Sequence, residues 1–153
     1  MVRSLIAAAV VVMLAASADA AGPRASSITV SDASVSPSRG TITTSTGRVT
    51  IENAGAADRL LSASCACAAK VQLHRMWMDG EVMRMREITG GLAVPAHGKL
   101  VLGGDEHLMF VGVKPLLKLG MHVKLTLKFQ HAGVITVDAP VQERAPMPMK
   151  MAH

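Results

Sequence analysis

The sequence predicts an all-β fold, an antiparallel sandwich or barrel built as a single domain. Its strand-like runs are short, and turn-forming Gly, Pro, Asn and Asp residues separate them. In residues 123–129 apolar and polar side chains alternate, which is the period of a strand with one buried face. No segment shows the periodicity of an amphipathic helix. Many short strands of this kind are typical of sandwiches and barrels.

Turn residues bound each expected strand. In chain order the strands are expected at Ile28–Val35, Arg48–Glu52, Arg59–Ala63, Lys70–Met78, Glu81–Ile88, Lys99–Leu102, His107–Gly112, His122–Gln130 and Val134–Val141. The breaks between them are expected at Pro37–Gly40, Asn53–Gly55, Asp79–Gly80, Gly90–Gly91, Pro95, Gly103–Gly104 and Gly133. Among these breaks, Asp79–Gly80 is the strongest hairpin signal, because Asp-Gly suits a two-residue turn.

Size and composition exclude several classes of protein. The chain has 153 residues, enough for one domain and too few for a large α/β enzyme. Aromatic residues make up only 2%, and the net charge of +5 is scattered, so we expect no nucleic-acid partner. No Ser-His-Asp spacing, HExxH motif or carboxylate pair stands out, and we therefore expect a protein that is not an enzyme.

The N-terminus has the pattern of a secretory signal. Residues 1–20 contain a basic start at Arg3, an apolar stretch over Leu5–Ala16 and the cleavage-site pattern Ala18-Asp19-Ala20. The apolar stretch has 12 residues, whereas a membrane-spanning helix needs about 20. We expect a cleaved signal, a flexible leader at 21–27, a domain at 28–141 and an irregular tail at 142–153. The exported chain would then have no membrane span and would meet oxidising conditions.

Histidine and methionine concentrate in the second half of the chain. If Asp79 and Gly80 form the hairpin turn, His74 faces Met85 across the two strands, and directly opposed Cβ atoms lie about 4.5–5.5 Å apart. His107 and Met109 are two residues apart on an expected strand, so they share a face. If that strand lies beside the hairpin, the four side chains converge. We interpret the neighbouring methionines as core filler, the commoner role of strand methionines. These are Met76, Met78 and Met83.

Two imidazoles and two thioethers form a soft, uncharged donor set. This mixture suits Cu(I) and suits Zn²⁺, Mg²⁺ or Ca²⁺ poorly. A thioether needs no deprotonation, and unlike a thiol it is not lost to disulfide formation outside the cytoplasm. A site without thiolates should hold copper and release it to a partner with better ligands. The residues therefore indicate copper transport.

The same residues resemble a known family. The spacing of these four residues is similar to the signature of the periplasmic copper chaperones called PCu(A)C. Ten residues separate His74 from Met85, twenty-one separate Met85 from His107, and one separates His107 from Met109. Flanking segments agree, and the similarity covers 28–141. The resemblance implies a cupredoxin-like Greek-key β-sandwich that binds one Cu(I) through these four side chains. We expect the protein to be a monomer. The resemblance also implies delivery in the periplasm to a copper-accepting protein, such as a cytochrome c oxidase subunit or another copper chaperone.

The chain departs from relatives of this kind at several positions. Ser34 and Ser36 stand where an aromatic residue and an Arg are usual, and the loop Pro37–Thr46 is rich in Ser and Thr. Cys65 and Cys67 stand where Ser and Pro types are usual. Two thiols at this spacing could close a disulfide, remain inert or bind a second Cu(I), and the sequence leaves these readings open.

Other questions also stay open. At the end of the chain, methionine alternates with other residues before a final histidine. This pattern is compatible with an auxiliary arm that captures copper and with a flexible terminus that has no role in metal binding. The donors in this segment are Met147, Met149, Met151 and His153. The main competing function is copper buffering or resistance without a dedicated acceptor. An electron carrier would need a Cys thiolate in the C-terminal loop, where this chain has none.

Overall fold

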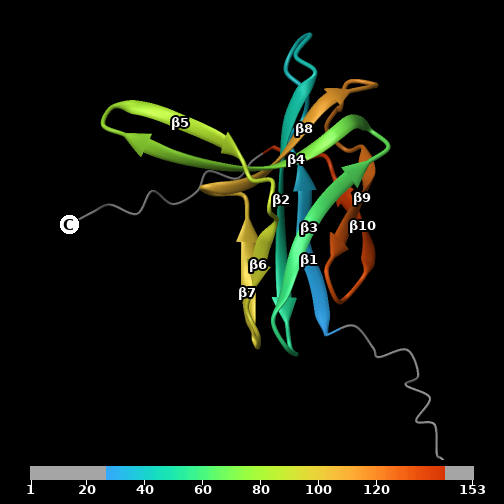
Figure 1. The fold of residues 1–153 in the computed structure, drawn as a ribbon. Coiled ribbons are helices and arrows are strands. Elements are labelled where there is room, and N and C mark those ends of the chain that lie inside the picture. Colours follow the sequence, from blue (N-terminus) through green and yellow to red (C-terminus); the bar gives the residue numbers. More distant parts are fainter. Residues whose placement is uncertain (1–26, 144–153) are drawn as a thin grey trace, which may run out of the picture.

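The computed structural model describes residues 27–143, and all its regular structure is β (Figure 1). The ten strands are β1 (Ile28–Val35), β2 (Thr44–Asn53), β3 (Asp58–Cys65), β4 (Ala68–Asp79), β5 (Val82–Glu87), β6 (Leu92–Val94), β7 (Gly98–Leu102), β8 (Glu106–Val113), β9 (His122–Phe129) and β10 (Val134–Pro140). Within this part of the chain, no helix is long and apolar enough to cross a membrane.

The strands form one sheet whose two ends meet. Its order is β1-β2-β8-β4-β3-β9-β10, with β5 added to β4, β6 to β3 and β7 to β2. At the seam, Val35 pairs with Val141 in a parallel bridge, and the amide of Gln142 donates to the carbonyl of Val35 at 3.0 Å. The sheet therefore closes into a barrel-like body, and the prediction of an all-β single domain is confirmed.

Alternation along the strands fills the barrel. In β9 the apolar residues of the predicted period point inward, and in β8 Leu108 and Phe110 are fully buried. Because neighbouring residues of a strand point to opposite faces, His107 and Met109 must lie on the outer face of β8. The core of the domain thus determines which side of the sheet carries the candidate metal ligands.

Two parts of the chain differ from the sequence prediction. The loop expected at Pro37–Thr46 is shorter, because β2 begins at Thr44 and pairs there with β8. Gly47 permits this pairing: a Cβ at that position would lie 2.6 Å from the ring of Phe110. No strand is predicted at β6, whose three residues pair with β3 alone. A run this short carries no detectable period.

The β4–β5 hairpin projects from the barrel (Figure 1), and its turn is not the predicted one. Asp79 pairs with Val82, so Gly80 and Glu81 form the two-residue loop. Gly80 has a φ of 63°, whereas Asp79 and Glu81 have no positive φ. Glycine at the first loop position suits a type II′ turn, while a type I′ turn over Asp79–Gly80 would require a positive φ at both residues.

Asp58 fastens the β9–β10 connection to the start of β3. Burial alone would raise the pKa of Asp58, but backbone amides of Arg59, His131 and Ala132 donate hydrogen bonds to its carboxylate and hold the pKa below 3.8. We expect Asp58→Ala to lower the free energy of unfolding by about 1–2 kcal/mol at pH 7. A folded-state pKa below the unfolded value makes this contribution present above pH 3.8 and lost as the pH falls through the folded pKa.

Urea denaturation of both proteins at pH 7, 5 and 2.5 measures the effect. The difference between wild type and variant should be similar at pH 7 and pH 5 and should shrink at pH 2.5. A difference that is the same at all three values would show that the carboxylate charge contributes nothing.

Candidate metal centre

The centre of the candidate site is a pair of histidines on adjacent strands. His74 of β4 lies directly opposite His107 of β8. Their ring centroids are 6.0 Å apart and the ring planes are inclined by 53°. Their chain neighbours Leu73 and Leu108 are both in the core, so the two rings share the outer face of the sheet. Two imidazoles from distant parts of the chain thus meet, as predicted.

The hydrogen bonding of His74 leaves one ring nitrogen available. Its Nε2 lies 3.3 Å from Oε1 of Gln72, an oxygen that accepts a hydrogen bond in the tautomer that carries the proton on Nε2. Nδ1 then presents a lone pair, and it is buried without a hydrogen-bond partner within residues 27–143. A ring nitrogen held by a partner while the other faces the site is the arrangement that metal-binding histidines use. His107 is 6% exposed, and its Nε2 is buried.

A pocket of about 260 Å³ lies beside this pair. Met76, Met85 and His107 contribute to its wall, and Thr46 and Arg48 of β2 contribute from another side. The pocket therefore joins thioethers of the hairpin to an imidazole of the barrel. Among residues 27–143 no three His, Cys, Asp or Glu side chains gather to hold a metal. The pocket lining contains the imidazole of His107 and the thioethers of Met76 and Met85, and Glu143 adds a carboxylate to it.

Met109 is the second predicted ligand on β8. It is half-buried on β8, two residues from His107 on the same face, and it pairs with Gln72 on one side and Thr46 on the other. Its thioether lies on the same face of β8 as His107, but Met109 does not form part of the pocket wall.

The predicted pairing of His74 with Met85 is wrong. Because the turn lies one residue later, His74 is opposite Glu87 and Met85 is opposite Met76. Met85 becomes a diagonal neighbour of His74, at about 7–8 Å between Cα atoms. The two residue numbers in each cross-strand pair now add up to two more than predicted. Because this change is even, every side chain stays on the face predicted for it. The convergence on one face therefore survives the error in register.

The interpretation of the hairpin methionines as core filler is also wrong. Met78 is 60% exposed and Met83 59% exposed, and Met76 lines the pocket. The available signal was parity: Met76 and Met78 are separated from His74 by two and four positions, so all three share a face. Arg48 and Gln72 were also missed, because neither residue belongs to a recognisable motif.

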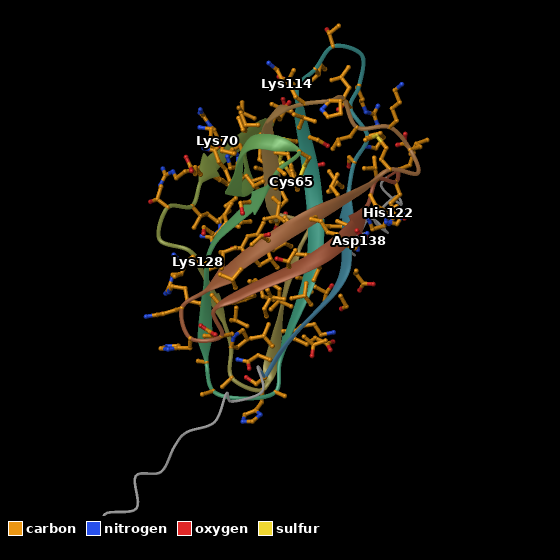
Figure 2. All side chains as sticks on the ribbon, turned by 90° about the vertical axis from the view of Figure 1, so that its right-hand side faces the viewer. Cys65, Lys70, Lys114, His122, Lys128 and Asp138 are labelled. Atoms are coloured by element: carbon orange, nitrogen blue, oxygen red, sulfur yellow. A yellow bond between two sulfur atoms is a disulfide. The ribbon has the colours of Figure 1, made fainter. Side chains whose placement is uncertain are left out.

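Cys65 and Cys67 form a disulfide at the end of β3 (Figure 2). Of the readings that the sequence left open, the structure therefore holds the disulfide, in which neither sulfur is a thiolate. The other auxiliary donors lie outside the described residues: Met147, Met149, Met151 and His153.

A second histidine contact lies apart from the pocket residues, on β9 and β10. Figure 2 shows His122 and Asp138 side by side, and Nδ1 of His122 is 2.5 Å from the carboxylate. Hydrogen bonds from His122 and from Lys124 lower the pKa of Asp138. Both side chains of the His122–Asp138 pair are largely exposed. His122 thus has a hydrogen-bond partner at the surface.

Solved structures resemble this fold. The copper-bound PCuAC domain from PmoF2 superposes with a TM-score of 0.64 at 20% identity, over 77% of this chain and 94% of that domain. Apo-DR1885 from Deinococcus radiodurans gives a TM-score of 0.61 at 28% identity, over 94% of this chain and 97% of that protein. Its CuI form gives 0.57 at 26% identity, over 83% and 84%. The cupredoxin-like fold that the resemblance implied is thereby confirmed.

Sequence comparison supplies the family. A family model described as "Putative lipoprotein LpqE-like" matches residues 28–141. A protein of Leifsonia xyli subsp. xyli named "Putative lipoprotein Lxx21020" is 31% identical over 133 residues, which cover 86% of this chain and 80% of that protein. The matched residues contain the whole barrel, the projecting hairpin and the histidine pair. This chain belongs to the LpqE-like family.

Proposed function

We propose that this protein binds Cu(I) outside the cytoplasm and carries it to an acceptor protein. The inner site consists of His74, Met85, His107 and Met109. The observation that carries the proposal is the cross-strand histidine pair, in which Nδ1 of His74 is buried with its lone pair available. Thioethers next to this pair complete a donor set without negative charge, which favours Cu(I) over Cu(II).

The related structures support the metal. DR1885 was solved with Cu(I), and the PmoF2 domain was solved with copper bound. The first of these is 26% identical to this chain. Copper is cargo in this proposal. The chain holds the ion through neutral ligands at the edge of a pocket, and an acceptor that offers thiolates removes it by ligand exchange.

The place of action and the acceptor belong to the same proposal. Residues 1–20 have the pattern of an export signal, and the Cys65–Cys67 disulfide is the form that cysteines keep in an oxidising compartment. We propose the periplasm as that compartment. The acceptor is a copper-binding protein there, such as a subunit of cytochrome c oxidase during assembly of its copper centre.

Anaerobic titration tests the binding. The purified chain is titrated with Cu(I) in competition with a chromogenic chelator, and the bound metal is examined by X-ray absorption. We expect one equivalent to be taken from the chelator and both nitrogen and sulfur to surround the ion. Absence of competition, or a shell of oxygen and nitrogen alone, would refute the proposal.

A further inference from the structure

One face of the β4–β5 hairpin is a double row of methionines. Met76 pairs with Met85 and Met78 pairs with Met83, in two successive cross-strand pairs. The pair nearer the barrel lines the pocket beside His107, whereas the pair nearer the turn lies open to solvent. The four thioethers therefore extend from the candidate metal centre to the tip of the projecting hairpin.

Packing does not explain the outer pair. Met78 and Met83 are 60% and 59% exposed, so neither fills a core. Methionine is not among the residues that strands prefer at exposed positions, where Thr, Val, Ile and aromatic residues are enriched. A thioether does offer a soft sulfur ligand that stays uncharged at any pH. Metal binding by their sulfur atoms would explain why methionine occupies these two positions.

The charges of the hairpin lie on its other face. Arg75 pairs with Arg86, and Trp77 pairs with Arg84, on the face opposite the methionines. These arginines have partners there: Arg75 bonds to Glu106, Arg84 to Asp79, and the guanidinium of Arg86 lies 5.8 Å from the ring of Trp77. Arg48, which lines the pocket with Met76 and Met85, belongs to β2. Among the strand residues of the hairpin, the only formal charge on the methionine face is Glu87, opposite His74. A cation on that face thus meets no like charge from the hairpin.

The spacing suits a metal ion held by two sulfurs. Directly opposed residues have Cβ atoms about 4.5–5.5 Å apart, and a methionine sulfur lies two bonds beyond Cβ on a rotatable arm. Met78 and Met83 can therefore both reach one ion between them. The next pair is two residues further along each strand, a step of about 6.5–7 Å.

We propose that Met78 and Met83 form a second, outer Cu(I) site made of thioethers alone, and that copper moves between it and the inner site through Met76 and Met85. Each step exchanges one thioether for another at the metal. The ion remains Cu(I), no proton or electron is transferred, and the departing sulfur returns to its free form. The inference rests on the proposed function for the identity of the metal.

Methyl NMR tests the outer site directly. The full chain, labelled with ¹³C at the methionine methyl groups, is titrated with Ag(I) as a redox-inert probe and then with Cu(I) under argon. We expect the first equivalent to shift the methyl signals of Met85 and Met109, and the second to shift those of Met78 and Met83. Single Met→Leu variants assign the signals while nearly conserving side-chain volume.

The matched variants separate the two sites. In the double variant Met78→Leu/Met83→Leu, we expect binding of the second equivalent of metal at the hairpin to be lost. The affinity of the inner site should change by less than about threefold. Release of Cu(I) from the inner site to a chelator should slow by about tenfold. Met121→Leu, which alters a half-buried methionine outside the hairpin, should leave both properties unchanged.

Two results would overturn the inference. One is a second equivalent that shifts methyl signals elsewhere and leaves Met78 and Met83 unaffected. The other is a double variant that retains both equivalents and the wild-type release rate. If the inner site binds and the outer pair does not, this inference fails alone. If no signal shifts with either metal, the proposed function fails with it.

Discussion

His107→Ala is expected to weaken Cu(I) binding by at least about 100-fold, which corresponds to about 2.7 kcal/mol. His107 is 6% exposed, forms part of the pocket wall and lies opposite His74, so its removal deletes a donor that no neighbouring side chain replaces. Loss of a residue that only supports a ligand costs 10–100-fold in other metal sites, and loss of a ligand should cost at least that much.

A chelator competition under argon measures the change. His131→Ala is the matched control, because His131 is an exposed histidine in the turn after β9 and its backbone amide, which donates to Asp58, is retained in the variant. This control should bind Cu(I) like the wild type. Folding of both variants is checked by thermal melting. A folded His107→Ala protein with wild-type affinity would remove the histidine pair from the site.

Phe110→Ala is expected to lower the free energy of unfolding by about 3–5 kcal/mol, the usual cost of deleting a buried phenylalanine. Phe110 is fully buried, three residues beyond His107 on β8 but on the opposite face. Its ring occupies the space that Gly47 leaves on β2. The free energy of unfolding of a natural domain is only about 5–15 kcal/mol in total, so this single substitution should remove a large share of it.

Urea denaturation followed by circular dichroism measures this loss. Val111→Ala is the matched control on the same strand, since Val111 is half-buried and pairs with Thr44 and Lys70 at the barrel surface. We expect that variant to lose about 1 kcal/mol or less. Equal losses in the two variants would mean that β8 does not separate a core face from an outer face.

Much of the fold could be predicted from the sequence because side-chain alternation is a local signal. The runs that became β9 and β10 had clear alternation and clear turns, and the structure places both near the expected bounds. The start of β2 could not be predicted. Its Ser and Thr residues look like a loop, and they form a strand because β8 lies beside them with Phe110 over Gly47. That contact joins segments more than 60 positions apart.

For the candidate site, the face of each strand side chain was predictable, but the cross-strand register was not. Parity along a strand fixes the face of a side chain, so His74 and Met85 were assigned correctly to one face. The exact partner depends on the turn, and Asp79-Gly80-Glu81 accommodates a two-residue loop in either of two positions. The exposure of Met78 and Met83 was hidden for a different reason. It follows from the projection of the hairpin beyond the barrel, which local sequence does not encode.

The open edge of β5 has a consequence for self-association. Within residues 27–143 this strand pairs only with β4, and an unpaired edge can recruit a strand from another molecule. A symmetric antiparallel union of two copies centred on Met85 would set Arg84 of one against Arg86 of the other, and like charges so opposed are destabilising. Arg84 and Arg86, whose side chains lie on the face opposite the methionines, thus also oppose edge-to-edge aggregation.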